Sequence, residues 1–335
     1  MNLPACSPNN STPGLLATLI ISAALTACPP LAIAQPANLE ERITITEIAF
    51  DDGWQTKFRG ASALFADERA GELFVADGGN SRIVILDEKL QSKFVFDHYV
   101  ADPRTGRSLK GEPRDVVVNS RGEIILVDNL TNQIEVLDFR GKLLEIVEPN
   151  KLYGDTTLTI KPQRLAIDRS DRLYVATGGD LITIMVLDDY YSLERTIGKR
   201  GSGEEDFNTI LTLQVHDGRI YATDLYAQPA VKVFDTSGAY LFGFGGHDVE
   251  RDDLSFPSGL AILEVDPGVV TIWVADGLRQ VIKVYDDSGE FLQTVGGFGF
   301  RPGEFRYPAD LAVQGDSVIY IVERVGNRIQ RFDFK

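Results

Sequence analysis

Cysteine and histidine are scarce in this chain of 335 residues, which contains only two cysteines and three histidines. Two cysteines exclude a disulfide-rich scaffold and a zinc module built from thiolates. Positive charge is also in short supply, because 33 Lys and Arg residues stand against 49 Asp and Glu residues, for a net charge of −16. A surface this acidic repels phosphate backbones and anionic lipid head groups, so nucleic acid is not an expected partner.

Long apolar runs are equally rare, and the clearest one lies near the start of the chain. Residues 15–27 (LLATLIISAALTA) form a 13-residue apolar run inside a segment, 1–34, that has no Asp, Glu, Lys or Arg. The run is too short to span a bilayer, and no transmembrane span is expected. It has the length of the apolar region of a secretory signal, and Ala32-Ile33-Ala34 supplies the small residues that precede a cleavage site. The sequence therefore predicts a signal peptide over residues 1–34 and a mature chain, 35–335, that forms a single domain.

A second processing route is also visible in this segment. Leu25-Thr26-Ala27-Cys28 resembles a bacterial lipobox, in which Cys28 would be lipidated and become the first residue. Both routes predict export, either to the periplasm or extracellular space or, with a lipid anchor on Cys28, to a membrane surface.

The rest of the chain is one unit repeated six times. Its clearest element is a short alternating segment that ends in Asp, as in RIVILD (82–87) and VIKVYD (281–286). The six closing aspartates recur at intervals of 47 to 51 residues, at Asp87, Asp138, Asp188, Asp235, Asp286 and Asp333. Two mostly apolar segments precede each closing aspartate and, in five units, a further one follows it after a polar turn. Each unit is therefore predicted to be a four-stranded antiparallel sheet.

The sixth unit has no following segment, but an alternating segment, 43–48, precedes the first unit. Pairing this N-terminal strand into the last sheet would close a ring and leave no exposed edge. The expected fold is therefore an all-β, six-bladed β-propeller of four-stranded blades, with the last blade closed by the N-terminal strand.

The units resemble NHL repeats, which carry a Pro before the first strand and an Asp after the second. The clearest match is the glycine-rich connection 296–308 (GGFGFRPGEFRYP), and the N-x-R element is present at 80–82. The resemblance covers roughly residues 43–335 and identifies the chain as an exported bacterial member of the NHL-repeat propellers. It implies the fold rather than one function, because such propellers include binding modules and several enzymes.

The innermost strands are expected to line a central channel, and the residues at their starts are expected to surround its mouth. These residues are Ala63, Asp115, Arg164, Thr212, Gly259 and Asp310. Arg164 is the single cation of this ring, with Asp115 beside it and Asp310 across the axis. We therefore expect Arg164 to bind a carboxylate and the two aspartates to orient the ligand. The alternative is a set of solvated charges that pair with one another.

A second ring of acidic residues ends the second strands and offers oxygen ligands for a hard cation such as Ca²⁺. It comprises Asp77, Asp128, Asp224, Asp276 and Glu323. An Asp at this position also caps a turn by accepting backbone N–H bonds, and its recurrence once per unit favours that structural role. The resemblance adds peptide-amidating lyases, which bind zinc through three histidines, but the spacing of His98, His216 and His247 does not match that arrangement.

Two classes of function follow from these observations. The first is an exported binding module that holds a protein, peptide or glycan ligand on one face, without a cofactor. The alternative is a metal-dependent lyase or a lactonase-like hydrolase that uses Zn²⁺ or Ca²⁺ in the channel. No nucleophile elbow, phosphate-binding loop or HExxH motif is present to identify a catalytic residue.

Overall fold

The computed structural model describes residues 39–102, 104–247 and 250–335. The predicted signal peptide, its cleavage site after Ala34 and the alternative lipidation site at Cys28 lie outside these residues. No helix within the described ranges is both long and apolar enough to cross a membrane.

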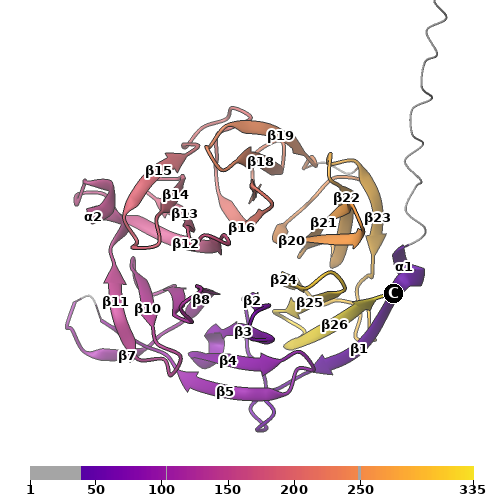
Figure 1. The fold of residues 1–335 in the computed structure, drawn as a ribbon, viewed down its shortest axis with the longest axis horizontal. Coiled ribbons are helices and arrows are strands. Elements are labelled where there is room, and N and C mark those ends of the chain that lie inside the picture. The colour runs from indigo at the N-terminus through magenta and orange to yellow at the C-terminus, as the bar shows by residue number, and fades with distance from the viewer. Residues whose placement is uncertain (1–38, 103, 248–249) are drawn as a thin grey trace, which may run out of the picture. The chain divides into compact units, whose positions relative to one another are not determined.

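Six four-stranded antiparallel sheets stand around a central axis, as Figure 1 shows in a view down that axis. From the innermost strand outward, blade 1 consists of β2 (Ala63–Asp67), β3 (Glu72–Asp77), β4 (Arg82–Asp87) and β5 (Ser92–Asp97). Blade 2 consists of β8 (Pro113–Val118), β9 (Ile124–Asp128), β10 (Ile134–Leu137) and β11 (Leu143–Val147). Blade 3 consists of β12 (Ile160–Ile167), β13 (Leu173–Gly179), β14 (Ile184–Leu187) and β15 (Leu193–Ile197). Blade 4 consists of β16 (Ile210–His216), β17 (Arg219–Asp224), β18 (Val231–Asp235) and β19 (Tyr240–Phe244). Blade 5 consists of β20 (Pro257–Asp266), β21 (Val269–Asp276), β22 (Val281–Asp286) and β23 (Phe291–Val295). Blade 6 consists of β24 (Pro308–Gln314), β25 (Val318–Glu323), β26 (Arg328–Phe334) and, outermost, β1 (Ile43–Ala49). The predicted six-bladed propeller is confirmed.

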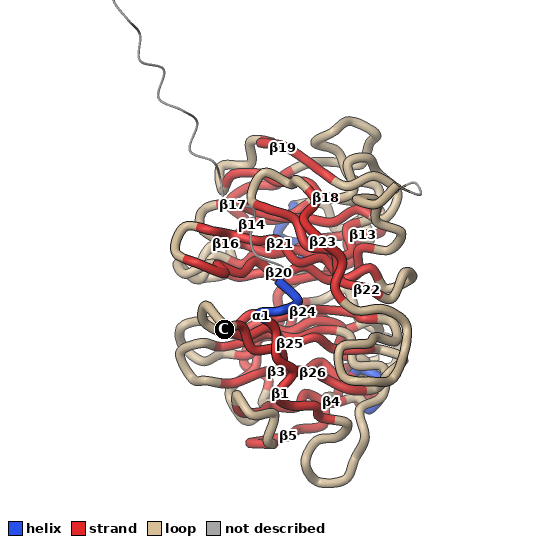
Figure 2. Tube along the Cα trace, turned by 90° about the vertical axis from the view of Figure 1, so that its right-hand side faces the viewer, coloured by secondary structure: helices blue, strands red, loops and turns tan. Residues whose placement is uncertain are grey.

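Closure of the ring by the N-terminal strand is confirmed as well. Strand β1 pairs antiparallel with β26, from Ile43 opposite Phe334 to Ala49 opposite Ile329. The short helix α1 (Leu39–Arg42) extends this closure, because Leu39 is buried and packs into the core shared by blades 5 and 6. Figures 1 and 2 both show α1 beside the C-terminus.

The hydrophobic core lies between neighbouring blades. Strands alternate their side chains between two faces, and each face packs against the face of the next sheet. Trp273 of blade 5, for example, shares one cluster with Phe305 and Phe332 of blade 6. The ring is therefore held together by six apolar interfaces, and each blade depends on both of its neighbours.

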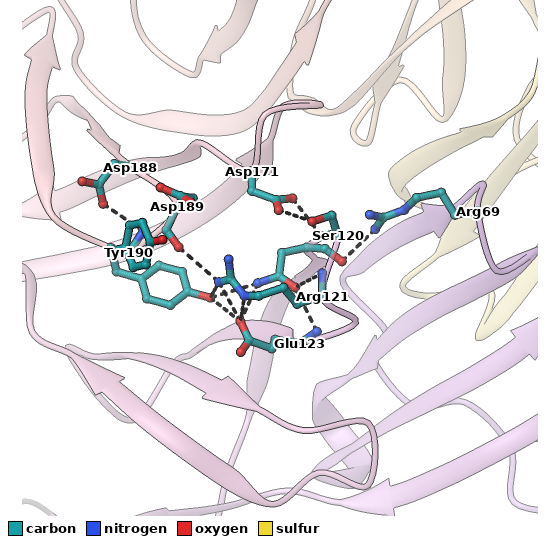
Figure 3. A network of polar contacts seen from close by, with 10 residues as sticks. Arg69, Ser120, Arg121, Glu123, Asp171, Asp188, Asp189 and Tyr190 are labelled. Carbon is teal, nitrogen blue, oxygen red and sulfur yellow. Dashed lines mark hydrogen bonds and ion pairs between the residues drawn. The ribbon is translucent and has the colours of Figure 1, made fainter.

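Polar turns reinforce the contacts between blades at one end of the ring, which we call the lower face. It carries the turns that join the first strand to the second and the third to the fourth. Figure 3 shows part of such a network, in which Ser120 N donates to Asp171 of the next blade at 2.8 Å. In the same turns, Asn119 Nδ2 donates to Glu123 and to the Tyr191 hydroxyl of the next blade, at 2.6 and 3.2 Å. Arg121 also bonds Glu123 and the Asp189 carbonyl. Burial and the neighbouring Glu123 raise the pKa of Tyr191 to about 12, which keeps its hydroxyl protonated as a donor.

Few elements lie outside the blades. A 3₁₀ turn, η1 (Gly78–Asn80), follows β3, and a short helix, α2 (Pro149–Tyr153), which was not predicted, begins at a proline in the connection before β12. Strands β6 (Tyr99–Ala101) and β7 (Ser108–Lys110) form a hairpin in the connection between blades 1 and 2. Figure 1 places β7 at the outer edge of the ring, away from the channel.

Candidate functional site

The upper face carries the connections that enter the innermost strands and those that leave the second strands. Where these connections meet the axis, the structure contains a cavity of about 340 Å³. This volume falls in the range of small-molecule binding sites. Beneath it, the innermost strands line a narrower space of about 40 Å³.

A repeated backbone irregularity determines which side chains reach the cavity. In five innermost strands the register with the second strand shifts at the same place, so that one residue is skipped. The skipped residues are Arg114, Gln163, Leu211, Ser258 and Ala309. Such a bulge re-aims a side chain that strict alternation would send to the other face. Arg114 consequently lines the upper cavity, and the next residue, Asp115, lines the channel beneath it.

Three arginines contribute to the cavity wall: Arg114 of blade 2, Arg164 of blade 3 and Arg324 of blade 6. None of them lies within 4.0 Å of a carboxylate among the described residues. Arg164 instead donates to two backbone carbonyls, from Nε to Leu211 O at 2.5 Å and from Nη1 to Arg114 O at 3.3 Å.

The electrostatics of Arg114 show how closely the three positive charges are grouped. Its Nε is buried and has no hydrogen-bond partner among the described residues, while Nη1 lies 3.3 Å from the Asn129 side-chain oxygen. Burial lowers the pKa of Arg114 to about 10; the charges of Arg164 and Arg324 add to this effect, and Asp115 opposes it. With three arginines against one carboxylate, Glu112, the cavity lining carries a net positive charge on a chain whose net charge is −16. An anion in the cavity would relieve this repulsion.

Asp115 and Asp310 are placed differently from the sequence expectation. They are 6 % and 7 % exposed, and they line the narrow channel under Arg164 rather than the upper cavity. Each carboxylate accepts a backbone N–H from the next blade: Asp115 from Leu165 at 2.8 Å and Asp310 from Leu64 at 2.9 Å. They therefore tie neighbouring blades together, and Arg164 is the member of the predicted trio that reaches the ligand-sized cavity.

Both channel aspartates hold protons more tightly than usual. Burial raises the pKa of Asp310 to about 7, with a further contribution from the charge of Asp115, while Arg164 acts in the opposite direction. Burial also raises the pKa of Asp115, against the effect of Arg164. Near neutral pH the channel therefore carries less negative charge than its two carboxyl groups suggest, and it neutralises Arg164 only in part.

The five candidate metal ligands do not converge on one point. Each carboxylate is buried and accepts bonds within its own blade, mostly from backbone N–H groups of the connection that precedes the innermost strand. Asp77 accepts from Arg59 N at 2.8 Å, Asp224 from Asn208 N at 2.6 Å, and Glu323 from Arg306 N at 2.7 Å.

The two remaining members of this ring also bond within their own blades. Asp276 accepts from Ser255 N at 2.7 Å. Asp128 accepts from Leu130 N at 2.8 Å, and its second oxygen lies 3.1 Å from His98 Nε2. Within the described part of the chain, no three His, Cys, Asp or Glu side chains group closely enough to hold a metal ion. The ring supports the turn-capping interpretation of these residues.

Comparison with known proteins identifies the fold of this chain but assigns it to no family. No family model and no curated protein matches the chain. Among solved structures, a protein of unknown function from Bacteroides thetaiotaomicron VPI-5482 superimposes with a TM-score of 0.61 at 15% identity, over 88% of this chain and 76% of that one. A streptogramin B lyase superimposes with a TM-score of 0.57 at 12% identity, over 89% of this chain and all of that one (100%). At these identities the likeness shows the fold alone, and that fold is the six-bladed β-propeller.

Proposed function

We propose that this propeller is a binding module that holds an anionic ligand in the cavity at the upper mouth of its channel. The observation that carries the proposal is the set of three arginines, Arg114, Arg164 and Arg324, which line one cavity without an ion-pair partner among the described residues. Guanidinium groups pair two oxygens at once, so carboxylates and phosphates are the matching chemistry. A peptide C-terminus or an acidic sugar carries such a group, in line with the expected protein, peptide or glycan ligand.

The test is binding of inorganic phosphate, measured by thermal shift and calorimetry at constant ionic strength. Arg114→Met should weaken phosphate binding at least tenfold, because one of the three guanidinium groups is lost. The matched control is Arg104→Met, which removes the same charge from the exposed β6–β7 hairpin. Equal phosphate affinity in the wild type and both variants would overturn the proposal.

An enzyme is the second candidate, and one observation favours it. Burial raises the pKa of Asp310 to about 7, and Asp310 lines the same narrow channel as Arg164. Perturbed carboxyl groups of this kind are typical of acid–base sites. The lyase or lactonase-like hydrolase considered from the sequence would also need a metal. Metal analysis of the purified protein separates the two, because one tightly held equivalent of Zn²⁺ or Ca²⁺ would favour the enzyme.

The resemblance to NHL repeats and the features of residues 1–34 support two further parts of this proposal. The chain is an NHL-type propeller, and it acts outside the cytoplasm, in the periplasm or the extracellular space. Cleavage after Ala34 or lipidation at Cys28 would be distinguished by the mass of the mature protein.

A further inference from the structure

Part of the cavity lining is apolar. Phe256 of blade 5 and Tyr307 of blade 6 both line it, with ring centroids 5.7 Å apart and ring planes inclined at 50°. Both residues are only partly buried, and Leu211 and Ala309 add further apolar surface to the same cavity. An inorganic anion would leave this surface unused.

The backbone of Tyr307 adopts a strained conformation. Tyr307 has a φ of +59°, in the left-handed region that is unfavourable for a non-glycine residue. The corresponding residue of blade 1, which likewise lies three positions before the ring residue, has a φ of +62° and is glycine, Gly60. A tyrosine therefore occupies a conformation in which the neighbouring blade has glycine. A contact made by the ring would account for its presence.

The backbone at Gly277 packs against both rings. A Cβ on Gly277 would lie 3.3 Å from Tyr307 Cζ and 3.4 Å from Phe256 Cδ1, so the backbone of the β21–β22 turn packs directly against both side chains. Arg324 follows β25, and its N–H donates to the Tyr307 carbonyl at 2.9 Å. Tyr307 and one of the three arginines are thus joined within blade 6, while Phe256 approaches them from blade 5.

On this basis we propose that the ligand is an organic acid whose carboxylate is bound by the arginines and whose apolar, ring-bearing part lies against Phe256 and Tyr307. The inference rests on the proposed anion site and narrows its ligand class. The same chemistry has two sources, a free aromatic acid or the C-terminal residue of a peptide. The cavity of about 340 Å³ accommodates one ring and one carboxylate in either case.

Four probes test this inference by calorimetry at constant ionic strength: phenylacetate, acetate, phenylacetamide and the peptide N-acetyl-Gly-Gly-Phe. Phenylacetate should bind about tenfold more tightly than acetate, because burial of the ring removes apolar surface from water and this gain outweighs the cost of ordering the ring. Phenylacetamide, which has the ring without the charge, should bind at least tenfold more weakly than phenylacetate. Tighter binding of the peptide than of phenylacetate identifies a peptide C-terminus as the source, and weaker binding identifies a free acid.

Variants of the two aromatic residues test whether the ring of the ligand lies against Tyr307 and Phe256. Tyr307→Gly relieves the left-handed strain and should reduce the preference for phenylacetate over acetate to less than threefold, while phosphate binding persists. Tyr226→Gly, which removes an exposed tyrosine from the turn after β17, is the matched control and should leave the preference unchanged. Phe256→Leu provides a second variant if Tyr307→Gly does not fold.

Equal affinity for phenylacetate and acetate in the wild type would overturn this inference. So would an undiminished preference in the Tyr307→Gly and Phe256→Leu proteins. The proposed anion site would survive both results as long as phosphate binding still depended on Arg114. Loss of that dependence would instead refute the site itself.

Discussion

Replacement of Asp310 by Asn should remove a pH dependence from the stability of the fold. The Asp310 carboxyl has a pKa of about 7 in the folded protein, against an ordinary value of 3.8. Between these two pH values the folded state binds a proton that the unfolded state has already released. The free energy of unfolding of the wild type therefore falls as the pH rises from about 4 to about 7, and it is constant on either side with respect to this group.

The magnitude follows from the size of the shift. One pKa unit corresponds to about 1.4 kcal/mol, so the complete effect is at most about 4 kcal/mol. The amide that Asp310→Asn introduces keeps an oxygen that can accept the bond from Leu64 N, but it has no proton to lose. The free energy of unfolding of Asp310→Asn, relative to the wild type, should therefore increase between pH 4 and pH 7 by up to this amount.

The assay is urea denaturation of both proteins at pH 4, 5, 6, 7 and 8. The substitution can also change the free energy of unfolding by a constant amount at every pH. Only the part of the difference that changes with pH reports on the Asp310 carboxyl group. A difference that stays flat across this range would refute the account of the channel as a place where burial keeps Asp310 protonated.

Three further predictions concern the scaffold. A protein that begins at Asp51 lacks α1 and β1 and should lose several kcal/mol of unfolding free energy relative to one that begins at Leu39, because the edge of β26 and its apolar partners are exposed; equal melting temperatures would contradict ring closure. Gly259→Ala places a Cβ 2.5 Å from a backbone atom of the next blade and should cost about 1–3 kcal/mol, whereas Gly297→Ala, with open space around it, should be nearly neutral in the same denaturation experiment. Tyr191→Phe removes the hydroxyl that accepts from Asn119 and donates to Glu123 on the lower face, and should cost about 1–2 kcal/mol by urea denaturation; an unchanged midpoint would show that this network does not stabilise the ring.

The fold was predictable because its information is local and repeated. Every blade has the same alternation of apolar and polar residues. In the first five blades the closing aspartate also accepts backbone N–H bonds in the turn that follows, as Asp235 does from Ser237 and Ala239. Six copies of such a weak signal indicate the architecture reliably. Closure was predictable for a similar reason, because an alternating segment precedes a set of units in which one strand is lacking.

The candidate site was predictable only in part. Arg164 was expected at the channel mouth from its place at the start of an innermost strand, and it lines the upper cavity. Arg114 was missed because a bulge after Pro113 turns two consecutive side chains toward the axis. Proline two residues before the ring position recurs in four blades, and this spacing is the signal that could have revealed the bulge. Arg324 was missed because it lies in a turn, whose direction depends on the neighbouring connection of blade 6.

The burial of Asp115 and Asp310 could not be predicted from the fact that both are acidic residues at the starts of innermost strands. From the sequence, Asp115 and Asp310 were indistinguishable from ligand-orienting groups. Their positions inside the channel are set by contacts between blades, namely the Leu165 and Leu64 N–H groups that lie 50 and 246 residues away in the sequence. Such long-range contacts leave no local pattern to read.

The most direct test of the central claim is the position of a bound anion in a crystal structure. We would soak crystals of the protein in selenate and collect diffraction data at the selenium edge. The account predicts that the strongest anomalous peak lies in the upper cavity, within hydrogen-bonding distance of the Arg114 guanidinium and of Arg164 or Arg324. Selenate found only on the outer surface, with none in the cavity, would contradict the assignment of this cavity as an anion-binding site.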